Sequence, residues 1–311
     1  MTPQVSLALV TYNQAGLLEA FLANYLRDGA SLLPLIVVDD GSEDRTPEIL
    51  GRLPRGSPVT FHRLAHVSAA HARNHALRLA NAPWLAFSDT DCLLDRGYFE
   101  TLATLPYRFP GAPAVEGAVR PPPGPKPPFT HSLFNPSGGT YATANMVFHV
   151  PSTLAVGGFD EGFGVNYRED TDLALTLMDR LGPIPFFPEL VVIHPHVPRS
   201  FAAALGKAFA GQRRLIEAEM RLFEKHPASY RRVRHYRDAY GTLMAWCLKY
   251  AGLYGKECLR YLFLTPGLTW RDRMRGLGLS ALALAVALWE QACTLWLCLE
   301  RWKRISRLRM P

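Results

Sequence analysis

The sequence lacks the cysteine patterns of a disulfide scaffold or a structural zinc site. Its 311 residues include five cysteines, an odd number, which form neither Cys-x-x-Cys pairs nor the spacing of a Cys/His zinc site. The one apolar run near the N-terminus, Val5–Val10, is too short for a secretory signal peptide. These absences predict a protein of a reducing, cytoplasmic compartment.

Charged residues are also few, and the positive ones are in excess. They make up 20% of the chain, against 48% apolar residues, and the formal net charge is +7. A basic protein suits an anionic partner, such as a nucleotide or an anionic membrane surface. No nucleic-acid partner is expected, because no recognised nucleic-acid-binding module accompanies the basic segment Arg231–Arg234.

Strand-like and helix-like patterns alternate over the first hundred residues. Buried strands are expected at Val5–Val10, Leu32–Val38, Val59–Arg63 and Trp84–Phe87, with helical spacing of apolar residues between them. This alternation predicts an α/β fold with a mostly parallel, doubly wound sheet.

The middle of the chain is rich in proline, and later segments return to regular patterns. Pro106–Pro128 is expected to be a loop that contains one strand, at Ala114–Val119. Beyond it, Tyr141–Val150 and Val191–Ile193 read as strands and Glu169–Leu181 as an amphipathic helix.

Polar residues follow the ends of the expected strands. Thr11 and Tyr12 follow the first strand, Asp39–Ser42 the second, and Asp89 and Asp91 the fourth. Because parallel strands bring their carboxyl ends to one edge, where ligands bind in open α/β sheets, these groups are expected to converge.

The residue types at this edge suit a nucleotide and a cation. Two carboxylates one residue apart can bind a hard divalent cation and a sugar. Tyr12 can stack on a base, Asp40 can accept hydrogen bonds from a base or ribose, and Arg73 can approach a pyrophosphate. The chain lacks the Gly-x-Gly-x-x-Gly sequence of nicotinamide dehydrogenases and the P-loop of NTPases, which argues against both classes.

The motifs, in this order, resemble those of the family-2 inverting glycosyltransferases of the GT-A fold. The similarity covers about residues 4–200 and consists of Thr-Tyr-Asn (11–13), Val-Val-Asp-Asp-Gly-Ser (37–42), Ala-Arg-Asn (72–74), Asp-Thr-Asp (89–91), Thr-Ala-Asn-Met (143–146), Gly-Gly-Phe-Asp (157–160) and Glu-Asp-Thr-Asp-Leu (169–173). The resemblance implies a donor that is a nucleotide-diphosphate sugar, expected to be a UDP-sugar. It also implies a Mn or Mg cofactor and a glycan or lipid-linked acceptor.

The resemblance also implies roles for single residues. Asp91 would hold the cation against the diphosphate, and His194 or His196 would complete its coordination. The expected donor-binding residues are Thr11, Tyr12, Asp40, Arg73, Asp89 and Asn145. Of these, Asp40 matches the position that reads the nucleobase and Asp89 the one that touches the ribose or the sugar.

The general base is expected in the acidic pair at the start of the 169–181 helix. Asp170 is preferred and Glu169 is the alternative. The helix dipole favours an ionised carboxylate in the first turn, as a base requires. Helix capping alone also selects acidic residues at this place.

The chain lacks two features of processive synthases, and two other functions are alternatives to glycosyl transfer. The chain lacks the Gln-x-x-Arg-Trp motif of processive polysaccharide synthases and a set of several long membrane spans, so transfer of one sugar is expected. A nucleotidyltransferase would need a Gly-rich first loop with a basic residue, which is absent. A catalytically inactive nucleotide- or sugar-binding module is opposed by the retention of Asp89, Asp91, Glu169 and Asp170 together.

The expected organisation is a GT-A domain followed by a helical region. Residues 1–105 would form the nucleotide-sugar half, 106–200 the acceptor half, and 201–311 the helical region. Within the last, Leu277–Leu299 is nearly apolar but contains Glu290, and basic residues follow. A charge at the centre of a membrane-spanning helix costs at least ~2.5 kcal/mol. Peripheral attachment to the cytoplasmic face of a membrane is therefore expected, the alternative being a helix buried against the domain or a second subunit.

Overall fold

The computed structural model describes residues 3–124, 130–163, 168–198, 214–215 and 217–234, and six isolated positions beyond them. The chain divides into two compact units, Met1–Pro121 with Leu133–Pro195, and Pro122–Ser132 with His196–Pro311. In the part of the chain that the structure describes, no helix has both the length and the apolar character needed to cross a membrane. The apolar run Leu277–Leu299 lies outside the described residues except at Ala285, Leu288, Ala292 and Trp296.

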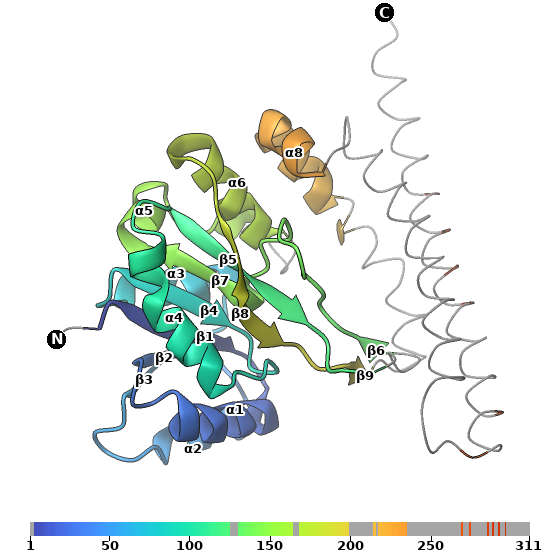
Figure 1. The fold of residues 1–311 in the computed structure, drawn as a ribbon. Helices are drawn as coiled ribbons and strands as arrows, with labels where there is room; N and C mark the ends of the chain where they lie inside the picture. Colours follow the sequence, from blue (N-terminus) through green and yellow to red (C-terminus); the bar gives the residue numbers. More distant parts are fainter. Residues whose placement is uncertain are drawn as a thin grey trace, which may run out of the picture. The chain divides into compact units, whose positions relative to one another are not determined.

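The first unit is built on a seven-stranded sheet flanked by helices (Figure 1). Its strands, in spatial order, are β3 (Val59–Arg63), β2 (Leu35–Asp39), β1 (Val5–Thr11), β4 (Trp84–Ser88), β7 (Met146–His149), β5 (Ala114–Arg120) and β8 (Phe186–Ile193). Only β7 runs antiparallel to its neighbours in this sheet. The predicted α/β fold with a mostly parallel sheet is confirmed.

Among its described residues, this unit has six α-helices. They are α1 (Ala15–Asp28), α2 (Thr46–Gly51), α3 (Ala69–Leu79), α4 (Arg96–Arg108), α5 (Val150–Ala155) and α6 (Glu169–Leu181), with 3₁₀ turns at Thr143–Asn145 and Glu161–Phe163. The described part of the second unit contains the strand pair β6 (Thr130–His131) and β9 (Val197–Pro198) and the helix α8 (Pro227–Arg234).

The central strands are buried on both faces, which explains their continuous apolar runs. On one face, Leu7 and Leu9 of β1 belong to a core cluster that includes Leu18 of α1 and Phe99 of α4. Such burial stabilises the sheet by about 25 cal/mol per Å² of apolar surface removed from water. The register is thereby fixed, since a shift by one residue would expose every buried side chain of one face.

Several elements differ from the expected boundaries; β8, for example, begins at Phe186 instead of Val191. Helix α4 was not predicted, and it continues past Pro106 into the segment expected to be a loop. Asp95 begins this helix by accepting a hydrogen bond from Tyr98 N at 2.8 Å. The expected strand 141–150 is shorter, because a 3₁₀ turn precedes β7 and α5 begins at Val150.

Candidate active site

The ends of β1, β2 and β4 place the predicted residues at one edge of the sheet. Thr11 pairs with Asp39 across β1 and β2, and Leu9 pairs with Ser88 across β1 and β4. The residues that follow these strands, Tyr12, Asp40 and Asp89, therefore leave the sheet at the same edge.

The first two strand ends form a compact polar corner. Asp40 is buried, and its Oδ1 accepts a hydrogen bond from Val67 N at 3.0 Å. Tyr12 is partly exposed, with its ring stacked on that of His66. Thr11 is buried, and its Oγ1 has no hydrogen-bond partner among the described residues. The rings of Tyr12 and His66 thus form the exposed part of this corner, and the Asp40 carboxylate is buried next to them.

The end of β4 carries a group of possible metal ligands. One ligand atom from each of Asp89, Asp91 and Cys92 lies within 4.8 Å of the others. Burial raises the pKa of the Asp89 carboxyl, and the nearby Asp91 carboxylate raises it further, whereas Arg73 opposes the shift. Burial also raises the pKa of the Cys92 thiol, which disfavours the thiolate that metal binding requires.

His194 approaches the same group from the end of β8. Paired backbone hydrogen bonds between Leu93 and Ile193, 2.8 and 3.2 Å long, hold the two segments together. His194 Nε2 lies 3.5 Å from Asp91 Oδ2, and its Nδ1 lies 3.0 Å from the Pro195 carbonyl oxygen. Since that carbonyl only accepts, we assign the hydrogen of a neutral ring to Nδ1. The approach of Nε2 to Asp91 Oδ2 would be favourable if the ring carried a second proton or if both residues bound a cation.

The carboxylates of α6 meet an arginine from α3. Arg73 Nη1 donates to Glu169 Oε1 over 2.6 Å, and both side chains are largely buried. Glu169 Oε2 has no hydrogen-bond partner among the described residues. In this structure Arg73, expected at the diphosphate, is therefore engaged by Glu169.

Asp170 lies beside this ion pair and differs from it in electrostatics. Burial, and then the neighbouring Glu169 carboxylate, raise the pKa of Asp170 to about 6, while Arg73 and Arg168 oppose the shift. Thr171 N donates to Asp170 Oδ1 over 2.6 Å. The Asp170 carboxylate is thus ionised at neutral pH but more basic than an ordinary aspartate.

One contact next to Arg73 could not be predicted from the sequence. Asn74, next to Arg73 on α3, donates to the Phe159 carbonyl at 2.9 Å and accepts from Phe159 N at 2.8 Å. Gly158, at φ +72°, has no Cβ to collide with the Asn74 side chain. Both segments belong to recognised motifs, but no local pattern signals that one binds the other.

Asn145 and His196 were also predicted to belong to the site. Asn145 is buried, and its side-chain nitrogen donates to the carbonyls of Ala118 and Leu190 at 2.9 and 2.8 Å. Its amide therefore joins β5 to β8 inside the core. His196 belongs to the second unit, and its assignment as a metal ligand stays a prediction.

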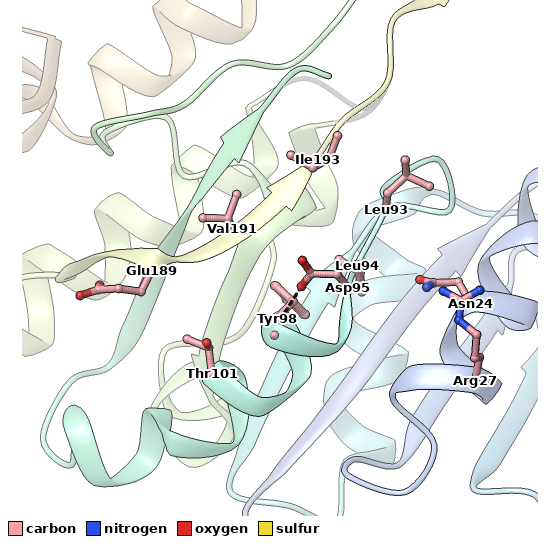
Figure 2. Close-up of a pocket in the computed structure, with 11 residues that line it drawn as sticks. Asn24, Arg27, Leu93, Leu94, Asp95, Tyr98, Thr101, Glu189, Val191 and Ile193 are labelled. Carbon is pink, nitrogen blue, oxygen red and sulfur yellow. Dashed lines mark hydrogen bonds between the residues drawn. The ribbon is translucent and has the colours of Figure 1, made fainter. Parts of the chain in front are cut away.

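A cavity of about 550 Å³ lies beside this site, and its lining does not include the carboxylates of Asp89, Asp91, Glu169 and Asp170. Figure 2 shows its lining side chains, which come from α1, the turn before α4, α4 itself and β8. Leu93 and Ile193 reach its wall, so the backbone pair that positions Asp91 and His194 also borders this cavity.

A sequence model of glycosyl transferase family 2 matches residues 6–110. The match includes Asp40, Arg73, Asp89 and Asp91. This segment is a family-2 glycosyltransferase domain.

Curated relatives of the glycosyltransferase domain match it over about one hundred residues. The chain is 34% identical over 104 residues to a validoxylamine A glucosyltransferase of Streptomyces hygroscopicus subsp. jinggangensis, covering 32% of this chain and 25% of that protein. It is 28% identical over 103 residues to the uncharacterized glycosyltransferase EpsJ of Bacillus subtilis, covering 33% of this chain and 30% of that protein. The matched part thus spans about a quarter to a third of these relatives.

Solved glycosyltransferases share the fold over a longer stretch. The mannosyltransferase PcManGT from Pyrobaculum calidifontis, in complex with GDP-Man and Mn2+, has a TM-score of 0.55 at 21% identity. That match covers 95% of this chain and 88% of the other. GalNAc-T7 with UDP, GalNAc and Mn2+ gives the same TM-score at 12% identity over 73% of this chain and 49% of that one. The predicted GT-A architecture is confirmed.

Proposed function

We propose that this protein transfers one sugar from a nucleotide-diphosphate sugar to an acceptor hydroxyl, with inversion and with a divalent cation. The observation that carries the proposal is the convergence of two acidic sites on one arginine. Arg73 bonds Glu169, and it acts electrostatically on Asp89 and on Asp170. A donor site at Asp89 and a proton acceptor at Asp170, both next to Arg73, suit glycosyl transfer.

The acidic groups fit a hard divalent cation. The oxygens of Asp89 and Asp91 and the imidazole of His194 are ligands that Mn²⁺ and Mg²⁺ accept. Arg73 acts on Asp89, Glu169 and Asp170, and Arg168 acts on Asp170, so two guanidinium groups face three carboxylates beside Asp91 and a further positive charge is favourable there. When bound there, a cation supplies charge that stabilises the leaving diphosphate.

The protein residues then have distinct tasks in one displacement. The Asp170 carboxylate accepts the proton of the acceptor hydroxyl, whose oxygen forms a bond to the anomeric carbon. The bond from that carbon to the diphosphate oxygen breaks, and the nucleoside diphosphate leaves with the electron pair. Attack from the opposite face inverts the anomeric configuration. Glu169 holds the Arg73 guanidinium between the donor side and the acceptor side.

The finer assignments extend this proposal. A UDP-sugar donor is our proposal because Asp40 offers a buried acceptor for a base N–H. Solved structures that share the fold carry GDP-Man in one case and UDP in another, so the fold admits either base. A glycan or lipid-linked acceptor and placement on the cytoplasmic membrane face are proposed from the basic, apolar C-terminal sequence.

The test compares two aspartates of equal exposure in the full-length protein. Asp91 and Asp28 side chains are both 19% exposed, but Asp28 lies at the end of α1, where it pairs with Arg27. We expect Asp91→Asn to weaken Mn²⁺-dependent binding of UDP or GDP at least tenfold in calorimetry and to abolish release of nucleoside diphosphate from UDP-glucose or GDP-mannose. Asp28→Asn should change neither. Equal binding by Asp91→Asn, or wild-type binding that is insensitive to EDTA, would contradict the proposed metal site.

A further inference from the structure

The loop that carries His66 is docked on the end of β2. Leu64 N donates to the Asp39 carbonyl at 2.8 Å, and Val67 N donates to Asp40 Oδ1 at 3.0 Å. Gly41, at φ +81°, allows this approach, because a Cβ there would lie 2.7 Å from His66 N. The Asp-Asp-Gly-Ser motif thus binds a second loop as well as offering its own carboxylates.

His66 itself joins the two residues expected at the nucleobase. Its ring stacks on Tyr12 with centroids 3.9 Å apart and planes 14° from parallel. Its Nδ1 lies 3.1 Å from the Asp40 carbonyl oxygen and 3.3 Å from Asp40 Oδ2. Both oxygens are acceptors, so we assign a hydrogen to Nδ1, which leaves Nε2 of the neutral ring as an acceptor.

The backbone and the exposure of His66 indicate a ligand-facing role. The residue lies in the left-handed region, at φ +48°, which is uncommon outside glycine and is concentrated at ligand sites. Its side chain is 54% exposed, whereas the Asp40 side chain beneath it is 4% exposed. An aromatic ring that is stacked, hydrogen-bonded and still open to solvent can receive a planar base.

We infer that His66 is a specificity-determining residue of the donor site, where it forms with Tyr12 and Asp40 the surface that receives the nucleobase of a nucleoside diphosphate. This inference rests on the proposed function. The His66 ring adds stacking area to Tyr12, its Nδ1–H orients Asp40, and its Nε2 accepts from a base N–H. Bases differ in the donors that they present at these atoms, so the same contacts select among them.

Two substitutions separate the stacking of His66 from its hydrogen bond. His66→Asn removes the ring but tolerates the left-handed backbone, and His66→Phe keeps a ring without the Nδ1–H. The matched control is His62→Ala, since His62 is an exposed histidine on the preceding strand whose ring packs against His75. Each full-length variant is titrated by calorimetry with UDP, GDP and inorganic pyrophosphate in the presence of MnCl₂.

We expect His66→Asn to weaken the preferred nucleotide at least about fivefold, as loss of an aromatic stack and a hydrogen bond implies. His66→Phe should retain more affinity but alter the ratio of UDP to GDP dissociation constants at least about threefold. Pyrophosphate binding should stay within twofold of wild type in both variants, and His62→Ala should match wild type throughout. In donor hydrolysis the loss should fall on KM, with kcat nearly unchanged.

Different failures overturn different claims. Wild-type protein that binds neither nucleotide overturns the proposed function and this inference with it. Wild-type protein that binds a nucleotide, with unchanged affinity and unchanged UDP:GDP ratio in both His66 variants, overturns this inference alone. A parallel loss of pyrophosphate binding would assign His66 a merely structural role and also overturn it.

Discussion

Replacing Asp170 by Asn should stabilise the protein at neutral pH while abolishing transfer. The reason is the cost of keeping this carboxylate ionised where it lies. Burial and the Glu169 carboxylate raise the Asp170 pKa from an ordinary value of 3.8 to about 6. Asparagine has nearly the same shape and can still accept the hydrogen bond from Thr171 N, but it carries no charge.

The sign and the size follow from proton linkage. Because the pKa of Asp170 is higher in the folded state, the folded protein binds this proton more tightly than the unfolded chain does. The free energy of unfolding therefore falls as pH rises from below 4 to above 6. A difference of about two pKa units corresponds to about 3 kcal/mol at pH 8, and about half of it is present at pH 5.

The assay is urea denaturation of Asp170→Asn and wild-type protein, followed by circular dichroism with EDTA present. We expect the variant to be more stable at pH 8, by up to about 3 kcal/mol, with a smaller difference at pH 5. Asp28→Asn, which alters a surface pair with Arg27, should leave the free energy of unfolding nearly unchanged.

Two results would refute this reasoning in different ways. A variant that is less stable than wild type at pH 8, or a difference that does not vary with pH, refutes this account of the Asp170 carboxylate. A stable Asp170→Asn variant that still transfers sugar or hydrolyses donor at the wild-type rate refutes the assignment of Asp170 as the base. In that case Glu169 becomes the candidate.

Two further predictions test the packing around the site. Arg73→Met should lower the free energy of unfolding by about 3 kcal/mol in urea, because Glu169 would stay buried without its partner, and adding Glu169→Met should restore part of that loss. Gly117→Ala should lower the melting temperature by several degrees, since its Cβ would overlap the Asn145 side chain, whereas Gly16→Ala, at an open position of α1, should not lower it.

The sheet could be predicted because its signal is local. Strands β1, β2 and β4 are continuous apolar runs that end at polar residues, and each is buried in the folded domain. The continuation of helix α4 past Pro106 differs from the expected loop, which starts at this proline. In the structure Pro106 lies in the last turn of the helix, where few backbone hydrogen bonds depend on it.

The partners of the site residues could not be predicted, because they are distant in sequence. Arg73 and Glu169 are 96 positions apart, and Asn74 and Phe159 are 85 apart. Hydrophobic periodicity indicates the type of a single helix or strand. It does not indicate which helix end contacts which loop. The sequence therefore predicted on which strand or helix each acidic residue lies. Which residues come into contact depends on the order of the strands in the folded sheet.

Asn145 and His66 show why a motif does not by itself assign a contact. Asn145 lies within a recognised motif, yet its side-chain nitrogen donates to carbonyls of β5 and β8. Gly117, which has no Cβ, leaves space for this side chain. His66 lies outside every motif, yet it touches both Tyr12 and Asp40. A residue's access to a ligand is set by what its neighbours leave exposed, and that depends on the tertiary packing. The spacing of residue types in a motif is compatible with either outcome.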